Sequence, residues 1–251
     1  MKKFITWHII ISLLDIKKIA ISSILLAICL AAWFLPQTGI LLNRLDINIS
    51  IFLNQFIGQN YWTYFWGVFN KNFENYLNQV VMILIMIYHI WQSDKKTHSI
   101  AQLITTYSFL LLGIFLMQLI FIDILNIRKP SPTLSIPNFV NISHLLEDPG
   151  IKSQSNRSFP SGHGFAMFYW AIFTASFLPK NLSSLAWIAA IFFSLPRLMV
   201  GAHWPSDIVA SIFIANLYVQ LIISTPLYFV YNSVVEKIIK NIMKYCGSRS
   251  K

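Results

Sequence analysis

Long apolar segments recur along the chain and constrain its fold more than any other feature. A helix needs about 20 mostly apolar residues to cross the core of a bilayer, and there the backbone must satisfy its own hydrogen bonds. Hydropathy predicts about six such spans, some short or tilted. The sequence therefore indicates an all-α integral membrane protein built as a six-helix bundle. The predicted spans are Ile19–Leu35, Tyr76–Trp91, Ser99–Leu125, Gly164–Leu178, Leu185–Leu195 with its flanks, and Ile208–Tyr231.

The composition agrees with a single membrane domain over residues 1–251. Hydrophobic residues make up 56% of the chain and charged residues 11%, which is far more apolar than a soluble domain. In such a protein the net charge of +10 indicates cytoplasmic loops and contacts with anionic headgroups rather than nucleic acid. The two cysteines, Cys29 and Cys246, lack the spacing of a zinc site, so we expect no metal and no cofactor.

The N-terminal segment is expected to be an uncleaved amphipathic anchor. Lys2 and Lys3 precede an apolar run that lacks a small-residue cleavage site. Phe4, Trp7 and Ile11 recur at helical spacing, as in an interfacial helix. The expected organisation is an anchor at 1–18, membrane helices at 19–231 with an active-site core at 126–210, and a basic cytoplasmic tail at 232–251.

The distribution of Lys and Arg predicts the orientation. An even number of spans places both termini on one side, which carries twelve basic residues against seven on the other. By the positive-inside rule, both termini are expected in the cytoplasm. The twelve are Lys2, Lys3, Lys17, Lys18, Lys95, Lys96, Lys180, Lys237, Lys240, Lys244, Arg249 and Lys251, and the seven are Arg44, Lys71, Arg128, Lys129, Lys152, Arg157 and Arg197.

Three polar stretches are expected on the outer side, at Asn126–Leu134, Arg157–Gly164 and Pro196–Asp207. The first two stand at the ends of a long loop that contains several prolines. Loops of this length in a compact domain are usually functional or disordered. Because the charges gather at the two ends of this loop, the pattern favours a function.

The residue types in these stretches suit phosphoryl transfer. Arg and Lys neutralise phosphate charge, and Arg adds a bidentate fork. Ser161 and Gly162 precede a predicted helix, whose free N–H groups bind an anion, and Gly162 permits close approach to the backbone. Asp207 follows His203 by four residues, so it can orient the imidazole and stabilise its cation. His203 is therefore a candidate nucleophile, and His163 a candidate acid for the leaving group.

Each feature also has a structural explanation when it stands alone. Ser161 at a helix start is commonly an N-cap, and a His and an Asp one turn apart commonly form a structural pair. Arg197 alone can reach lipid headgroups, while Arg128 with Lys129 alone is an ordinary solvated turn. Their joint occurrence on one membrane face favours a shared phosphate site.

The motifs resemble those of the type 2 phosphatidic acid phosphatase family of membrane lipid phosphatases, which read Lys-x6-Arg-Pro, Pro-Ser-Gly-His and Ser-Arg-x5-His-x3-Asp. Residues 160–163 match the second motif completely. Arg197, His203 and Asp207 match the third, with Pro196 in place of its leading Ser. The first motif is degenerate, since Lys129 and a proline stand where Arg-Pro is expected.

The resemblance implies a metal-independent reaction in two steps on the periplasmic side of the membrane. His203 would attack phosphorus to give a phosphohistidine, and His163 would protonate the departing group. Asp207 would orient His203. The phosphate oxygens would be held by Arg197, Ser161, Gly162 and Lys129, with Arg128 in place of the missing first-motif lysine.

Within the family, "RKPSPTL", "SFPSGHG" and "PRLMVGAHW" are most similar to the lipid A 1-diphosphate synthase branch of Gram-negative inner membranes. That likeness implies transfer of phosphate from undecaprenyl diphosphate to lipid A. Hydrolysis of undecaprenyl diphosphate, phosphatidylglycerol phosphate or lipid A by the same site is the alternative. The vanadium haloperoxidases share the motifs but are soluble.

A lipid transporter without chemistry is the alternative from another class. Transport pathways place charged groups within the spans, whereas here, apart from Asp123, the charges cluster on one face. An enzyme is therefore the better interpretation. The segment Leu45–Trp66 on the same outer side reads as an interfacial helix, capped by Asp46 and ended by Gly58, followed by an aromatic belt.

Overall fold

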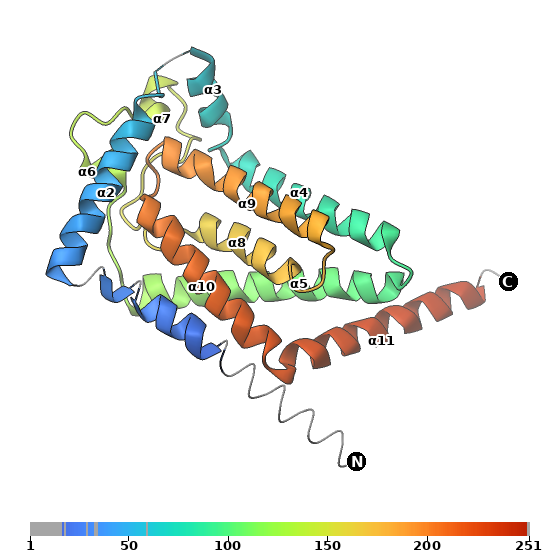
Figure 1. Cartoon of the computed structure of the whole chain (residues 1–251). Helices are drawn as coiled ribbons and strands as arrows, with labels where there is room; N and C mark the ends of the chain where they lie inside the picture. Colours follow the sequence, from blue (N-terminus) through green and yellow to red (C-terminus); the bar gives the residue numbers. More distant parts are fainter. Residues whose placement is uncertain (1–16, 18, 29, 33–34, 59, 250–251) are drawn as a thin grey trace.

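The computed structural model describes residues 17, 19–28, 30–32, 35–58 and 60–249. The predicted anchor at residues 1–18 lies outside this part of the chain, apart from Lys17. The described residues are predominantly helical and form no strand, as the sequence predicts (Figure 1). The elements are α2 (Pro36–Asn54), α3 (Asn60–Val68), α4 (Asn72–Gln92), α5 (Lys96–Met117), the π-helix η1 (Gln118–Ile124), α6 (Pro132–Ser135), α7 (Ile142–Leu145), α8 (Gly162–Thr174), α9 (Lys180–Met199), α10 (Pro205–Ile223) and α11 (Pro226–Arg249).

Helix α8 forms the centre of the bundle. Every residue from Gly164 to Ala171 is buried, as expected of a helix that is apolar on all sides and lies in the core of a protein. Helices α10, α9 and α5 provide that cover (Figure 1). With 13 residues, α8 is only about 20 Å long, which is short for a full membrane span.

The described residues contain three helices that are long and apolar enough to cross a membrane. They are Lys96–Ile124, Lys180–Met199 and Pro205–Ile223. A fourth span results if the helices Ile19–Ala32 and Gln37–Asn54, which meet at 84°, count as one. The chain is thus a multi-pass membrane protein, but the described residues do not establish the six spans that hydropathy predicts, because α8 and the apolar part of α4 are short.

The predicted span Ile208–Tyr231 is wrong, because two helices occupy it. Helix α10 ends at Ile223, and Pro226 begins α11. Pro has no N–H to donate and its fixed φ suits the first turn of a helix, so a new helix starts there. Helix α11 then folds back against α5 and extends away from the rest of the bundle (Figure 1).

The predicted interfacial helix, capped by Asp46 and ended by Gly58, starts too late in the chain, because α2 already begins at Pro36. Helix α2 ends at Asn54, and α3 begins at Asn60. Between them Gly58 has a φ of 99°, a conformation that glycine adopts without strain. Gly58 therefore marks a break, as predicted, but Asp46 lies in the middle of α2 and caps nothing in that helix.

The predicted polar stretches meet at one end of the bundle. Helices α8 and α10 begin there, and α9 and η1 end there (Figure 1). The loop between η1 and α8, which contains α6 and α7, covers this end. The connections from α4 to α5 and from α8 to α9 lie at the opposite end (Figure 1). The alternating direction of successive helices thus gathers the candidate site residues.

Candidate active site

Two stretches of the long loop run side by side at the site. The Ser158 amide donates to Lys129 O at 2.8 Å. The Ser131 amide donates to Ser155 O at 2.8 Å, and the Ser155 amide donates to Ser131 Oγ at 3.0 Å. These bonds hold the degenerate first motif against the residues that precede the second motif. The two motifs, which are distant in the sequence, therefore lie close together in the structure.

The end of α9 is a Schellman motif that positions His203. The Ala202 amide donates to Arg197 O at 3.0 Å, and the Gly201 amide donates to Leu198 O at 3.1 Å, which is the bonding pattern of this motif. Arg197 O also accepts from the His203 amide at 3.2 Å. The backbone thus fixes the distance between Arg197 and His203 of the third motif. Arg197 itself is only 4% exposed.

Gly201 is required at this turn. Its φ is 70°, in the left-handed region that other residues avoid. A Cβ here would lie 2.3 Å from the Phe139 ring and 2.6 Å from Thr133 Oγ1. Thr133 Oγ1 also donates to Gly201 O at 2.9 Å. The long loop therefore packs directly on the turn that presents His203.

The ring of His203 is held by a backbone carbonyl. Its Nδ1 lies 2.7 Å from Ser158 O, and a carbonyl oxygen accepts only from an N–H. In the neutral ring the proton is therefore on Nδ1, which leaves the lone pair on Nε2. The carboxylate expected to orient the ring, Asp207, has its Oδ2 3.8 Å from Nδ1. That distance is an electrostatic contact rather than a hydrogen bond.

Asp207 is fully buried and has two other partners. Its Oδ2 accepts from the Trp204 amide at 2.9 Å and so caps the first turn of α10. Its Oδ1 accepts from Lys129 Nζ at 2.7 Å. The indole of Trp204 donates to Pro130 O at 2.7 Å, which ties this turn to the loop. Asp207 is thus a structural hub beside His203, with its charge compensated by Lys129.

Lys129 lies between two carboxylates. Besides Asp207, its Nζ contacts Asp46 Oδ2 at 3.4 Å and Ser206 Oγ at 3.1 Å, and it lies 5.4 Å from the centre of the Trp204 ring. Burial lowers the pKa of Lys129, and the charges of Asp207 and Asp46 oppose that shift. Lys129 is therefore held inside an ion-pair cluster and not on an open surface.

Asp46 is a site residue that the sequence does not reveal. It is 3% exposed and reaches from α2 to the start of α10. There its Oδ1 accepts from the Ser206 amide at 3.0 Å, and its Oδ2 accepts from Ser206 Oγ. The only sign of this role in the sequence is that Asp46 is a carboxylate within an apolar segment. No local pattern links Asp46 to Ser206, which lies 160 positions further along the chain.

Ser161 and Gly162 form the start of α8. Ser161 is its N-cap, with Oγ accepting from the Gly164 amide at 3.1 Å. Ser161 O contacts Ser211 Oγ at 2.9 Å, which joins α8 to α10. A Cβ at Gly162 would lie 3.3 Å from Met117 Cε. The N-terminus of α8 is thus anchored beside the N-terminus of α10, and both present amides at this end of the bundle.

His163 lies on the α9 side of α8. Its Nε2 is 3.0 Å from Phe193 O, so this nitrogen carries a proton. Asn78 Nδ2 from α4 is 3.2 Å from Nε2 and 3.5 Å from Nδ1. A nitrogen that donates to a carbonyl cannot also accept from an amide, so Asn78 is suited to donate to Nδ1. Asn78 and Phe193 are further residues that the sequence analysis does not identify.

Arg128 is exposed. Its side chain contacts Asn126 and not the ion-pair cluster of Lys129, Asp46 and Asp207. Its Nε donates to Asn126 Oδ1 at 3.4 Å, and Arg157 Nη2 reaches the same oxygen at 3.5 Å. Arg157, which is also exposed, directly precedes the Ser158 carbonyl that holds His203.

Among the described residues there is no group of three or more His, Cys, Asp or Glu arranged for a metal ion.

The chain is similar in sequence to proteins of known family. Residues 107–231 match the PAP2 superfamily model. The chain is 27% identical over 200 residues to "Lipid A 1-diphosphate synthase" of Escherichia coli strain K12, covering 78% of this chain and 82% of that protein. It is 37% identical over 73 residues to "Undecaprenyl-diphosphatase" of Sulfolobus acidocaldarius, covering 29% of this chain and 34% of that one.

A solved structure shares the fold. The crystal structure of a transmembrane PAP2 type phosphatidylglycerolphosphate phosphatase from Bacillus subtilis superimposes with a TM-score of 0.50 at 19% identity. The match covers 88% of this chain and 97% of that one. The second and third motifs both fall within the 107–231 match. The chain therefore belongs to the PAP2 superfamily and is a membrane lipid phosphatase or phosphotransferase.

Proposed function

We propose that this protein transfers the terminal phosphate of undecaprenyl diphosphate to lipid A through a phosphohistidine at His203. The observation that carries the proposal is the 2.7 Å hydrogen bond from His203 Nδ1 to Ser158 O. It leaves the lone pair on Nε2, the nitrogen that can attack phosphorus. The similarity to the lipid A 1-diphosphate synthase over most of both chains supports the choice of donor and acceptor.

In the first step, Nε2 of His203 bonds to the terminal phosphorus and the bond to the bridging oxygen breaks. The Nδ1 proton stays in place, so the phosphorylated ring becomes cationic. Ser158 O stabilises this cation by a hydrogen bond, and the Asp207 carboxylate at 3.8 Å stabilises it by charge. The leaving lipid phosphate takes a proton from the cationic, doubly protonated form of His163, whose ring turns from Phe193 O to the substrate, and the neutral His163 regains this proton from the attacking phosphate in the second step.

The phosphate oxygens are bound by groups around His203. Arg197, the Gly162 amide and the N-terminus of α8 supply positive charge and donors. Lys129 adds its charge from within the ion-pair cluster, and Arg128 adds its charge from the surface. In the second step a phosphate oxygen of lipid A attacks the phosphohistidine, and the Nε2–P bond breaks to restore the neutral ring. No net redox change or cofactor is involved.

The proposed setting is a bacterial inner membrane. Residues 1–251 form one domain with six membrane-crossing or membrane-embedded segments, an N-terminal amphipathic anchor and both termini in the cytoplasm. The charge distribution of the sequence supports this orientation. The active site then faces the periplasm.

Hydrolysis is the second candidate function. A phosphohistidine can be resolved by water in the same site, and two similar proteins are named for phosphatase activity, an undecaprenyl-diphosphatase and a phosphatidylglycerolphosphate phosphatase. The match to the undecaprenyl-diphosphatase covers only 34% of that protein. It therefore gives less support than the match to the lipid A 1-diphosphate synthase, which covers 82% of that protein.

Label transfer distinguishes the two functions. Purified protein is incubated in mixed micelles with lipid A and undecaprenyl diphosphate labelled in its terminal phosphate. The proposal predicts labelled lipid A, with free phosphate as a minor product. Labelled inorganic phosphate alone, unchanged when lipid A is added, would establish the hydrolase instead.

A further inference from the structure

Asn78 in α4 has a buried amide oxygen that bonds to nothing. The residue is 1% exposed, and among the described residues its Oδ1 accepts no hydrogen bond. A buried amide oxygen in that state has lost its hydration without compensation. Such an atom in a folded protein calls for an explanation. The other end of the same amide faces the candidate acid, His163.

The amide of Asn78 is oriented for a neutral His163. Its Nδ2 lies 3.2 Å from Nε2 and 3.5 Å from Nδ1 of the ring. Because Nε2 also lies 3.0 Å from Phe193 O, it carries the proton of the neutral ring. Nδ1 then has a lone pair, and Nδ2 of Asn78 is a donor beside it. This orientation suits the neutral ring and not the cation.

The cationic ring needs the opposite orientation of the amide. When His163 takes up its second proton, both ring nitrogens become donors. The Nδ2 group is a donor as well, so it repels the cation. A half-turn about the Cβ–Cγ bond of Asn78, a torsion with two broad and equivalent wells, exchanges Nδ2 and Oδ1 in place. Oδ1 then accepts from Nδ1–H of His163, and the oxygen that lacked a partner gains one.

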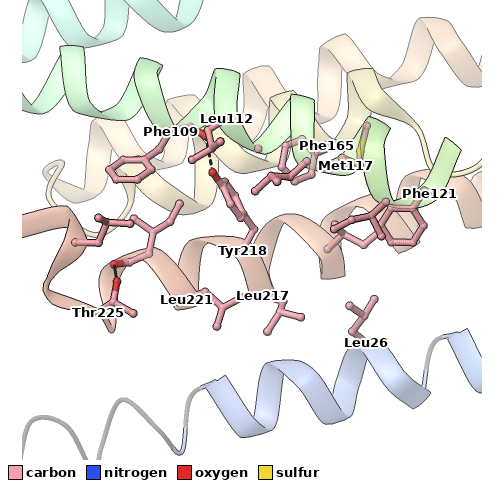
Figure 2. Close-up of a pocket in the computed structure, with 16 residues that line it drawn as sticks. Leu26, Phe109, Leu112, Met117, Phe121, Phe165, Leu217, Tyr218, Leu221 and Thr225 are labelled. Atoms are coloured by element: carbon pink, nitrogen blue, oxygen red, sulfur yellow. Dashed lines mark hydrogen bonds between the residues drawn. The ribbon is translucent and has the colours of Figure 1, made fainter. Parts of the chain in front are cut away.

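The cavity on the opposite side of α8 does not supply this acceptor. It has a volume of about 520 Å³ and is lined by residues of α5 and α10 (Figure 2). Phe165, which lines it from α8, follows His163 by two residues, a little over half a turn of the helix, so the two side chains point to opposite sides. The hydroxyl of Tyr218 in the lining donates to Phe109 O at 2.8 Å (Figure 2). The ring of His163 is thus held from α4 and α9, away from this cavity.

We propose that Asn78 is a positioning residue for the proton donor: its amide turns when His163 is protonated, and Oδ1 then holds the Nδ1 proton. The inference rests on the proposed function, which makes His163 the acid. Nε2 is the nitrogen that gives its proton to the bridging oxygen of the leaving group, while the Nδ1–H bond stays intact. The ring that remains is neutral. It regains a proton at Nε2 from the attacking phosphate in the second step.

The two histidines of the site then act in the same way. Ser158 O holds Nδ1–H of His203 at 2.7 Å, which leaves the lone pair on Nε2 for the attack. With Oδ1 of Asn78 on Nδ1 of His163, each histidine works through Nε2 and has an oxygen on Nδ1. A backbone carbonyl cannot turn, which suits a nucleophile with one fixed tautomer. A side-chain amide can turn, which suits an acid that alternates between two protonation states.

A sulfur atom in the bridge of the donor tests the inference. Undecaprenyl diphosphate is compared with the analogue that has sulfur in place of the bridging oxygen, because the leaving thiophosphate departs without a proton. Asn78→Leu removes both amide atoms, and Asn78→Asp keeps an oxygen acceptor but loses the amide donor. Gln79→Leu is the matched control. Gln79 also bonds to α8, accepting from Trp170 Nε1 at 3.1 Å, but two turns further along that helix than His163.

The expected loss depends on the leaving group. On the oxygen-bridged donor, Asn78→Leu should slow the release of undecaprenyl phosphate in a single turnover by about tenfold or more. The sulfur-bridged donor should restore its rate to within about threefold of the wild type. Asn78→Asp and Gln79→Leu should stay within about threefold of the wild type on both donors.

Two results would overturn the inference. A loss in Asn78→Leu that sulfur does not relieve would mean that Asn78 only supports the fold. Asn78→Asp as slow as Asn78→Leu on the oxygen-bridged donor would mean that the amide acts through its N–H and not through its oxygen. Because aspartate has the shape of asparagine, this second comparison holds even if Asn78→Leu folds poorly.

His163→Ala separates this inference from the proposed function. If His163 is the acid, its loss should match that of Asn78→Leu in kind, with rescue by sulfur, and adding Asn78→Leu should change the rate less than about twofold, because the two residues act as one unit. An equal loss of His163→Ala on both donors would refute the acid role in the proposed function, and the inference with it. Rescue in His163→Ala but not in Asn78→Leu would refute the role of Asn78 alone. Neither result depends on whether lipid A or water accepts the phosphate, since only the release of undecaprenyl phosphate is followed.

Discussion

At the scale of single residues, the backbone determines the state of His203. Ser158 O fixes the Nδ1 proton by a hydrogen bond, while Asp207, the partner suggested by sequence spacing, is 3.8 Å away and bonds to Lys129 and the Trp204 amide. Because this acceptor is the backbone carbonyl of Ser158, a substitution of the Ser158 side chain does not remove it. The Asp207 carboxylate therefore contributes mainly charge to the ring and structure to α10.

Lys129→Ala should weaken the use of both lipids. It removes the ammonium group that donates to Asp207 Oδ1 at 2.7 Å, so a buried carboxylate loses its cationic partner. Transfer to lipid A and release of the donor phosphate should each fall at least tenfold. Lys71→Ala is the matched control, because Lys71 pairs with Asp148 outside the site. Equal activities of the two variants would show that the Lys129 charge is not used.

Asp46→Asn should shift the pH dependence of catalysis. Asp46 is one of two carboxylates whose charge raises the pKa of Lys129 against the effect of burial. Without that charge the pKa of Lys129 falls further, so the lysine loses its proton at lower pH. The alkaline limb of kcat/KM for dimethylallyl diphosphate should therefore move to lower pH, because the asparagine keeps the shape but not the charge.

The control for this profile is Asp148→Asn. Asp148 is paired with Lys71 away from His203, and the pair lowers the pKa of that carboxyl without affecting the site. Its profile should match that of the wild type. An alkaline limb that stays in place in Asp46→Asn would mean that Asp46 acts only as a structural partner of Ser206.

At the scale of elements, the turn between α9 and α10 brings the third motif together. The Schellman bonds of Arg197, Leu198 and Gly201 end α9, and the side chain of Asp207 caps α10. Between these two helix ends the chain has little freedom. His203 therefore owes its position to two adjoining helix termini and not to a flexible loop.

Gly201→Ala should damage this turn more than a matched glycine substitution. A non-glycine residue in the left-handed region costs about 1–2 kcal/mol, and at Gly201 the new Cβ would also clash with Phe139. Gly58 has a positive φ too, but a Cβ there meets nothing within 4 Å. Thermal unfolding in detergent should show a larger loss for Gly201→Ala, with a fall in kcat/KM of more than tenfold only for that variant. Equal losses of unfolding temperature and of kcat/KM in the two variants would mean that Phe139 moves and relieves the clash at position 201.

The sequence predicts elements better than it predicts contacts between them. The start of α8 at Gly162 and the break at Gly58 follow from local signals, and the structure has both. The continuation of the last span through Pro226 is wrong because hydropathy does not register a proline that starts a helix. Asp46 and Ser158 escape prediction because their roles depend on partners far along the chain.

At the scale of the whole molecule, the two ends of the helix bundle carry different features. The candidate site and its loop lie at one end, and the α4–α5 and α8–α9 connections lie at the other (Figure 1). Exposed apolar side chains such as Leu111, Phe115 and Ile188 cover the helices between them. Such a surface is stable against lipid tails rather than water. The proposed orientation places the site end in the periplasm.

Cysteine labelling tests that orientation. In a background with Cys29 and Cys246 replaced by Ser, single cysteines are introduced at His144 in the loop and at Lys237 on α11, both exposed positions. A membrane-impermeant maleimide should label His144→Cys in spheroplasts with an intact inner membrane, and Lys237→Cys only after the membrane is broken or inverted. The reverse pattern would place the candidate site in the cytoplasm.

Rapid quench shows whether phosphate passes through His203. Protein is mixed with undecaprenyl diphosphate labelled in its terminal phosphate, denatured within one turnover without acid, and digested for mass spectrometry. We expect an acid-labile label on His203, which disappears when lipid A is added and is absent from His203→Ala. Transfer of phosphate to lipid A by His203→Ala at a rate near that of the wild type would contradict it.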